Sequence, residues 1–340
     1  MTSRERLKLI IARKGAQADR CGFWLGNPHG DAWPLLNAHF GTKDGEELRA
    51  KLHDDFRWIA PWEYRDPSGR PQFPRKQKAS FGEGGVFADC EDPKEVDRHQ
   101  WGRPEYMVID GTIEALRGAG DCYRASGAWT CFYHDVMDLF GMENYMEKMY
   151  TAPEVVRAVT DRVCEFYYGV NERLFPAAKG HVDAFFLGND FGTQLDVICG
   201  PAQFDEFILP WFRKFTDQGH RHGLQVILHS CGSVHRVIDR LIDAGVDCLH
   251  PLQARARGME AERLARDFGG RIAFMGGIDT QELLVRGTPE EVREDVRRVK
   301  SVLGPNLIVS PSHEAILPDV PPANIEAMAK EAIQPLQAGW

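Results

Sequence analysis

The sequence lacks a long uninterrupted run of apolar residues. A signal peptide needs an apolar stretch of roughly 7–15 residues, and a membrane-spanning helix needs roughly 20. The chain opens instead with MTSRERLKLIIARKGAQADRC, in which charges flank a short apolar segment. This segment is better interpreted as an amphipathic helix that begins at Thr2 or Ser3. We therefore expect a cytoplasmic protein without membrane association.

Cysteine pairs are also missing. The eight cysteines are scattered along the chain, and no two of them form a CxxC motif. Such scatter is not typical of a disulfide framework, so we expect reduced thiols, most of them buried as small hydrophobic side chains. A cysteine in this sequence therefore needs further support before it is assigned a function.

Positive charge is in short supply. Lys and Arg number 41 against 50 Asp and Glu, for a net charge of −9. Phosphate recognition depends on clustered Lys and Arg, so nucleic acid is not an expected partner. The 340 residues, 43% of them hydrophobic and 10% aromatic, are enough for a large core in two average domains or in one large barrel.

From about residue 180 the sequence alternates between strand-like and helix-like segments. Apolar runs of strand length alternate with segments whose apolar residues recur every three or four positions, and 288–291 (TPEE) is a typical helix start. This alternation indicates a parallel sheet covered by helices. It predicts an α/β fold, a (β/α)8 TIM barrel with an N-terminal elaboration, as a single domain over 1–340. The predicted strands are 184–187, 224–228, 246–249, 271–275 and 306–309.

The first 180 residues show a weaker pattern. Residues 21–25 and 128–133 are predicted as strands, and 60–80, rich in proline and basic residues, as a loop. Residues 107–109 are predicted to belong to a β-hairpin. We interpret 30–120 as an insertion that contributes a lid.

In a parallel barrel the active site forms where the strands end. His181, His220 and His222 precede predicted strands, so they are expected at the opposite face. Polar or metal-binding residues follow five consecutive strands, and we expect them to share one mouth of the barrel. These are Asn189, Asp190, His229, Cys231, His250, Asp279 and His313.

The most informative of these patterns is the tripeptide at 229–231, HSC. Alternate side chains of an extended segment share a face, so His229 and Cys231 are expected to point the same way, with Ser230 pointing away. Imidazole and thiolate suit tetrahedral zinc, and His313 is well placed as a third ligand. The alternative is a hydrogen-bonded His and Cys that shape a pocket without metal. We expect His250 or Asp190 to complete or flank this site.

The C-terminal half also carries longer motifs. They are LGNDFGTQ (187–194), LHSCG (228–232), AGVDCLHPLQ (244–253), FMGGIDTQELL (274–284) with GTPEEV (287–292), and SPSHEAILPDVPPANI (310–325). Together they resemble the uroporphyrinogen decarboxylase superfamily over roughly 180–335. The segment 4–20 is similar to the first helix of that family, whereas 30–120 matches little. The superfamily is a (β/α)8 barrel, in agreement with the strand pattern.

The resemblance implies one of two chemistries. True uroporphyrinogen decarboxylases carry an RQAGRY-type segment that binds propionate carboxylates, whereas this sequence has FWLGNPHGDAW at 23–33. The other branch comprises zinc-dependent methyltransferases that work with corrinoid proteins, and its HxC motif matches His229 and Cys231. Its downstream cysteine is replaced here by His313, and Ala323 stands where relatives usually have Glu.

From this resemblance we hypothesise a zinc-dependent methyltransferase. Zinc with two neutral histidines and one thiolate keeps a net positive charge, which favours activation of a methoxy or methylamine donor. The methyl group of a small O- or N-methylated substrate would pass to a corrinoid on a partner protein, because the barrel occupies the chain to its C-terminus. The expected roles are zinc binding by His229, Cys231 and His313, catalysis by Asp190, and substrate binding by Asn189, His250, Gln253 and Asp279.

Two other functions stay open. One is metal-free decarboxylation of a tetrapyrrole or aromatic acid, with Asp190 holding ring N–H groups and arginines holding carboxylates. The other is non-catalytic binding of a corrinoid or tetrapyrrole and its transfer to a partner. The resemblance also allows a homodimer, which no pattern in the sequence indicates. The arginines available to a decarboxylase are Arg65, Arg70, Arg75 and Arg124.

Overall fold

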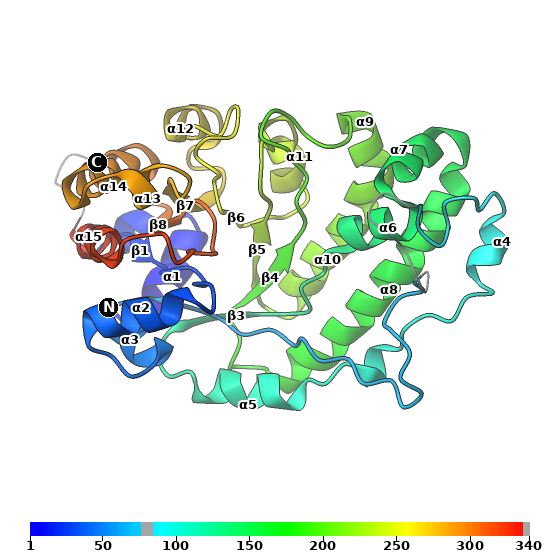
Figure 1. Ribbon diagram of the computed structural model, residues 1–340, viewed down its shortest axis with the longest axis horizontal. Helices are drawn as coiled ribbons and strands as arrows, with labels where there is room; N and C mark the ends of the chain where they lie inside the picture. The colour runs from blue at the N-terminus through cyan, green and yellow to red at the C-terminus, as the bar shows by residue number, and fades with distance from the viewer. Residues whose placement is uncertain (76–83, 336–340) are drawn as a thin grey trace.

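The computed structural model describes residues 1–75 and 84–335. Its centre is one sheet of eight parallel strands in the order β1-β8-β7-β6-β5-β4-β3-β2, which curves into a barrel (Figure 1). The predicted (β/α)8 barrel is therefore confirmed. The strands are β1 Gly22–Phe23, β2 Phe56–Trp58, β3 Tyr123–Ser126, β4 Ala184–Gly188, β5 Gln225–His229, β6 Cys248–His250, β7 Ala273–Ile278 and β8 Leu307–Pro311.

The seam between β1 and β2 is bridged by two aspartates. The Asp55 N–H donates to the Phe23 carbonyl, and the Asp55 carboxylate accepts the Phe23 N–H, both at 2.9 Å. The Asp54 carboxylate accepts the N–H of Leu25 at 3.2 Å. Side-chain oxygens thus satisfy backbone donors at the edge of the sheet, and the barrel closes.

Buried ion pairs stabilise the face of the barrel at which the strands begin. Helix α1 (Ser3–Ile11) lies across it, and its Arg6 contacts Asp55 at 2.7 Å. Arg4 of the same helix contacts Asp183, which precedes β4, also at 2.7 Å. Neither aspartate side chain is exposed. These contacts fasten the N-terminal helix to two sides of the barrel.

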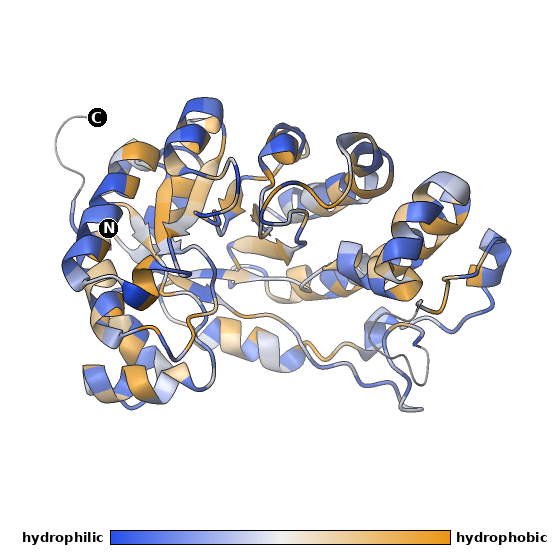
Figure 2. Cartoon of the chain, turned by 45° about the horizontal axis from the view of Figure 1, so that its top comes forward, coloured by the Kyte–Doolittle hydropathy of each residue, from blue (hydrophilic) through white to orange (hydrophobic). Residues whose placement is uncertain are grey.

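Apolar side chains fill both the barrel and the layer between the barrel and its helices. Inside the barrel, Phe56, Phe186 and Met275 are at most 1% exposed. Strand residues such as Phe185 and Leu228 belong to the second cluster, which packs with the helices. Figure 2 shows largely apolar strands beside helices with one polar and one apolar side. Because the sheet is buried on both of its faces, the strands appear in the sequence as continuous apolar runs.

The helices cover the outside of the barrel. Thr2 and Thr288 cap α1 and α14, and each forms a capping box, with Glu5 and Glu291 respectively.

In the described ranges no helix is both long and apolar enough to cross a bilayer. The remaining helices are α2 Ala32–Phe40, α3 Gly45–Lys51, α4 Pro93–Val96, α5 Asp110–Gly118, α6 Phe132–Phe140, α7 Met142–Thr151, α8 Pro153–Ala177, α9 Pro201–Gln203, α10 Leu209–Arg221, α11 Ile238–Asp243, α12 Ala261–Phe268, α13 Leu283–Arg286, α14 Pro289–Leu303 and α15 Pro322–Ala332, with the short helices η1 Gly15–Gln17, η2 Pro104–Tyr106, η3 Phe204–Ile208 and η4 His235–Val237.

The predicted strands are confirmed from residue 184 onward, where they match β4 to β8, and 21–25 contains β1. The predicted strand at 128–133 is wrong, because this segment is a loop that leads into α6, and its apolar Phe132 and Tyr133 are buried at the start of that helix. The hairpin predicted at 107–109 is also wrong, since Met107 forms only an isolated antiparallel bridge with Tyr64. In the predicted loop 60–80, the described part, 60–75, contains no helix or strand beyond this bridge.

Residues 30–120 are not wholly an insertion. They contain β2 as well as α2, α3 and α5, which belong to the barrel and its helical layer. The insertion proper lies between β2 and α5, and in Figure 1 its α4 lies beside α8, on the side of the molecule away from the termini. Its role as a lid stays a prediction.

Candidate metal centre

Polar side chains gather at the carboxyl ends of four strands, β4, β5, β6 and β8. His229 is the last residue of β5 and His250 the last of β6, and their Cα atoms are register partners. Asp190 follows β4, while His313 and Glu314 follow β8. Because the strands are all parallel, these ends share one mouth of the barrel, as the sequence predicted.

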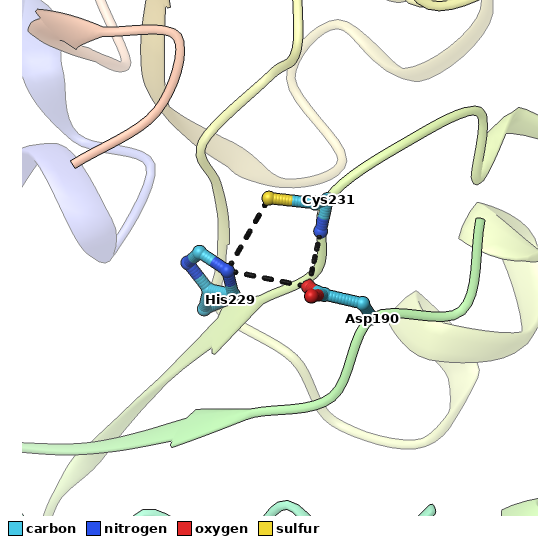
Figure 3. A group of neighbouring side chains, drawn as sticks. All are labelled: Asp190, His229 and Cys231. Carbon is cyan, nitrogen blue, oxygen red and sulfur yellow. Dashed lines mark hydrogen bonds and ion pairs between the residues drawn. The ribbon is translucent and has the colours of Figure 1, made fainter. Parts of the chain in front are cut away.

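Asp190, His229 and Cys231 point toward one another (Figure 3). His229 Nε2 lies 3.4 Å from Cys231 Sγ and 3.2 Å from Asp190 Oδ1. The Cys231 N–H donates to the same Asp190 oxygen at 2.8 Å, which fixes the carboxylate beside the imidazole. The Ser230 hydroxyl turns elsewhere and accepts the N–H of Phe191 at 3.1 Å. The predicted alternation along this segment is confirmed.

The spacing of these donor atoms fits zinc. Tetrahedral zinc with Zn–N near 2.0 Å and Zn–S near 2.3 Å places neighbouring ligand atoms about 3.3–3.5 Å apart. The two distances from His229 Nε2, 3.4 Å to sulfur and 3.2 Å to oxygen, fall at or close to this range. The ligand atoms of Asp190, His229 and Cys231 all lie within 4.8 Å of one another. A carboxylate, an imidazole and a thiol therefore converge, and these are ligand types that suit zinc.

The electrostatics favour the metal-binding form of the thiol. Burial disfavours the Cys231 thiolate, but hydrogen bonds with His229 and His313 outweigh burial and lower its pKa. Burial likewise opposes ionisation of Asp190, yet its contacts with His229 hold its pKa well below the usual range. For His229, the Glu314 and Asp190 carboxylates overcome burial and raise the pKa well above its usual range. The centre thus combines a carboxylate, a thiol with a lowered pKa and a strongly basic imidazole.

His229 has a second set of neighbours on its other nitrogen. His229 Nδ1 lies 3.1 Å from His250 Nδ1 and 3.4 Å from Glu314 Oε2. His250 is fully buried, and burial together with the charge of His229 lowers its pKa well below the usual range, so it is neutral. Glu314 was not predicted. It stands next to His313 in the motif after the last strand, which was the available signal.

His313, the predicted third ligand, comes close to Cys231. A hydrogen bond with Cys231 raises the pKa of His313, and the rings of His313 and His229 lie 6.2 Å apart at 90°. His313 Nδ1 accepts the N–H of Ala315 at 3.1 Å, so its Nε2 is the nitrogen left for other partners. His313 thus shares the mouth with His229 and Cys231, but the group of donor atoms within 4.8 Å of one another is completed by Asp190 and does not include His313. Zinc binding by His313 stays a prediction.

The other predicted site residues support the loops of this mouth. Asn189 is 1% exposed, accepts the N–H of Tyr133 and donates to Thr130. The Gln253 side chain accepts the N–H of Gly232 at 2.7 Å. Asp279 accepts N–H groups of 281 and 283 at the start of α13. These backbone contacts account for the polarity of all three, and their role in substrate binding stays a prediction.

Aromatic rings enclose the two central histidines. The Trp129 ring lies 5.3 Å from that of His229, and the Trp24 and Phe186 rings lie 5.2 and 5.5 Å from that of His250. Trp129 lies directly on Gly188, where a Cβ atom would come within 2.0 Å of the indole. Apolar rings therefore pack against both histidines, while His250 and Glu314 are the polar neighbours of the inner nitrogen of His229.

Two cavities flank the mouth. One, of about 610 Å³, lies beside His313 and is also lined by Gln253, Thr280 and Ser312, among others. We call it the His313 cavity. A second, of about 790 Å³, opens at the β1–β2 seam against Trp24. The His313 cavity directly adjoins a predicted zinc ligand, so it is the better placed of the two for a substrate.

The arginines named for a decarboxylase do not form a carboxylate clamp in the described structure. Arg124 lies at the opposite face of the barrel, where it contacts Asp183 at 3.4 Å. Arg65 is exposed and paired with Glu63, and Arg70 is exposed and paired with Asp66. Arg75 is exposed.

Comparison with known proteins shows similarity to one family and to methyltransferases. The sequence model of the family described as Uroporphyrinogen decarboxylase (URO-D) matches residues 124–334. A methylated-thiol–coenzyme M methyltransferase of Methanosarcina mazei is 24% identical over 157 residues, which are 46% of this chain but only 39% of that relative. A solved structure, a methyltransferase from Methanosarcina mazei, matches with a TM-score of 0.67 and 15% identity over 98% of both chains. This last likeness concerns the fold.

Proposed function

This chain belongs to the uroporphyrinogen decarboxylase (URO-D) family, and from that premise we propose that it is a zinc-dependent methyltransferase. It would move a methyl group from a small O- or N-methylated substrate to a corrinoid carried by a partner protein. Its similarity in sequence to one methyltransferase supports methyl transfer as the reaction. The zinc, the corrinoid and the methyl donor are inferred from the potential metal ligands at the mouth and from the resemblance of the HxC motif to that of the family.

The observation that carries the proposal is the group of donor atoms around His229. An imidazole, a thiol with lowered pKa and a carboxylate lie within 4.8 Å of one another at the mouth of the barrel. His229, Cys231 and His313 would hold zinc, with the Asp190 carboxylate close enough to be a further ligand. Three ligands without Asp190 leave zinc positively charged, whereas Asp190 as a ligand makes the centre neutral and a weaker Lewis acid.

When bound, zinc supplies the Lewis acidity that polarises the heteroatom bearing the methyl group. The chain itself positions the donor. The His313 cavity offers the hydroxyl groups of Thr280 and Ser312 and the amide of Gln253 beside the ligands. Trp129 packs against His229 and keeps water from the inner side of the imidazole. A donor small enough for this cavity would have its methyl group directed outward, toward a corrinoid presented at the mouth.

The proposal is tested by metal content and methyl transfer in the same preparations. We expect about one zinc per chain in the wild-type protein, and its loss in Cys231→Ala and His313→Ala. Cys122→Ala is the matched control, because Cys122 is buried at the opposite end of the barrel, directly before β3, and should keep its zinc. Methyl donors are then screened with cob(I)alamin, whose spectrum changes on methylation.

The outcomes separate the functions. Zinc that is retained in Cys231→Ala would contradict the ligand assignment. A wild-type protein that binds no zinc, even after zinc is supplied, would overturn the zinc-dependent reaction. Cobalamin binding without turnover of methoxylated or methylated-amine donors would instead indicate a carrier of the corrinoid.

A further inference from the structure

The second nitrogen of His229 faces two groups that compete for one hydrogen atom. His229 Nδ1 and His250 Nδ1 lie 3.1 Å apart, so one of these nitrogens must donate and the other must accept. Distance alone does not decide which nitrogen carries the hydrogen. Glu314, which approaches the same His229 nitrogen at 3.4 Å, can decide it.

Glu314 Oε2 is buried and forms no hydrogen bond among the described residues. Two histidine nitrogens lie near it, His229 Nδ1 at 3.4 Å and His313 Nδ1 at 3.7 Å. His313 Nδ1 already accepts the N–H of Ala315, so its lone pair is used and it cannot donate. If His229 Nδ1 carried no hydrogen, its lone pair would face the buried Glu314 carboxylate, in addition to the lone pair of His313 Nδ1, and would repel it. A hydrogen on His229 Nδ1 removes this repulsion and can also be donated in a hydrogen bond to His250 Nδ1.

We propose that Glu314 is a positioning residue that keeps the hydrogen of His229 on Nδ1, so that the Nε2 lone pair is directed at the metal between Cys231 and Asp190. The inference rests on the proposed function for the zinc, though not for the substrate. Metal-bound histidines commonly donate their other N–H to a carboxylate, which fixes the ring and raises its basicity as a ligand. His250 acts as the second acceptor and confines the ring from the barrel side.

A second metal on the inner side is the competing interpretation. His229 Nδ1, His250 Nδ1 and Glu314 Oε2 also form a compact group of potential ligands. An ion there together with one at Nε2 would require His229 to bind through both nitrogens and lose its last hydrogen. His250 is also fully buried against the Trp24 and Phe186 rings, which leave an apolar wall where a hydrated ion would have to enter. Positioning by Glu314 therefore fits this environment better.

The test compares Glu314→Gln and Glu314→Ala with the wild-type protein. Zinc affinity is measured by competition with a chromophoric chelator, and the ligand geometry by the visible spectrum of the cobalt(II)-substituted protein. Glu314→Ala should weaken zinc binding about 10–100-fold and shift the cobalt spectrum. In Glu314→Gln the amide oxygen can still accept the His229 Nδ1–H, so this variant should keep most of the zinc affinity and a cobalt spectrum close to that of the wild-type protein. Glu172→Gln is the matched control, because Glu172 pairs with Arg221, which precedes β5 at the opposite face of the barrel.

Nitrogen-15 NMR of the imidazoles gives a readout that does not need bound zinc. In the zinc-free wild-type protein, at a pH where the His229 imidazole is neutral, its hydrogen should lie on Nδ1, and Glu314→Ala should lose this preference. A bare Nδ1 in the wild-type protein, or unchanged zinc affinity in Glu314→Ala, would overturn the proposal. Two zinc ions per chain with one lost in Glu314→Ala would establish the second metal instead. Absence of zinc from the wild-type protein contradicts the proposed function, while the NMR result still decides the role of Glu314.

Discussion

Asp190 Oδ1 lies 3.2 Å from His229 Nε2, on the side of the imidazole that faces the Cys231 thiol. The carboxylate is held there by the Cys231 N–H at 2.8 Å, so its position depends on the backbone of the HxC segment itself. Asp190 can therefore act as a metal ligand or as the group that orients a substrate beside the metal. The two roles differ in whether zinc is retained when the charge is removed.

Asp190→Asn separates these roles. If the carboxylate binds zinc, the variant should lose at least about tenfold in zinc affinity, because a neutral amide is a much poorer ligand for zinc. Full zinc with methyl transfer reduced about 100-fold would assign Asp190 to the substrate alone. Zinc by mass spectrometry and methylcobalamin formation should be measured on the same sample. Unchanged values for both would contradict either role.

Asp55→Asn should destabilise the barrel seam. Asp55 is fully buried and pairs with Arg6 and Arg20, whose side chains are only 6% and 12% exposed. Removal of one partner from a buried ion pair leaves an uncompensated charge, which costs about 3–5 kcal/mol. Urea unfolding followed by circular dichroism measures the change. Asp19→Asn, which removes a half-exposed partner of the same Arg6, should cost less than about 1 kcal/mol, and an equal loss in both variants would contradict this account.

The sequence predicted those parts of the fold whose burial is uniform. β4 to β8 are apolar on both faces, so each appears as a continuous run. β2 was missed because its Phe-Arg-Trp segment is short, follows two aspartates and turns Arg57 outward to contact Glu46. β3, with the sequence YRAS, was missed for a similar reason, since its Arg124 contacts Asp183 across the barrel face.

The sequence predicted those site residues that directly follow strands. The HxC spacing placed His229 and Cys231 together because alternation along an extended segment is a local property. The closeness of Asp190 to His229 depends on the pairing of β4 with β5, and the contact of Glu314 with His229 joins β8 to β5 across the mouth. Such contacts depend on register and on side-chain direction, which the sequence pattern does not contain.

His220 should make the stability of the protein depend on pH. A hydrogen bond with Asp247 at 2.9 Å raises the pKa of His220 above 6.5, and the nearby charges of Asp217 and Asp247 act in the same direction. The folded protein thus binds this proton more tightly than the unfolded chain does. The stabilisation is fully present below about pH 6.5 and is lost as the pH rises through the folded-state pKa.

His220→Gln tests this dependence. The free energy of unfolding from urea titrations should fall less between pH 6 and pH 9 in the variant than in the wild-type protein. His29→Gln is the control, because His29 is exposed and lies in the loop after β1. The prediction fails when the two variants show the same pH dependence.

Gly188→Ala should displace Trp129 from His229. A Cβ atom at position 188 would come within 2.0 Å of the indole, and the ring cannot yield without leaving its place 5.3 Å from the imidazole. Forcing an extra methyl group into a packed site costs about 1–3 kcal/mol. We expect a corresponding fall in the free energy of unfolding and a loss of methyl transfer, with zinc retained because Gly188 contributes no ligand.

Gly111→Ala is the matched control for this substitution. Gly111 lies in α5, and a Cβ atom there would meet no described residue within 4 Å. Alanine is the better helix former, so this variant should be equally stable or more stable by up to about 1 kcal/mol. Intrinsic tryptophan fluorescence should change in Gly188→Ala and not in Gly111→Ala. If Gly188→Ala left both fluorescence and methyl transfer unchanged, the packing of Trp129 on β4 would not be what confines His229.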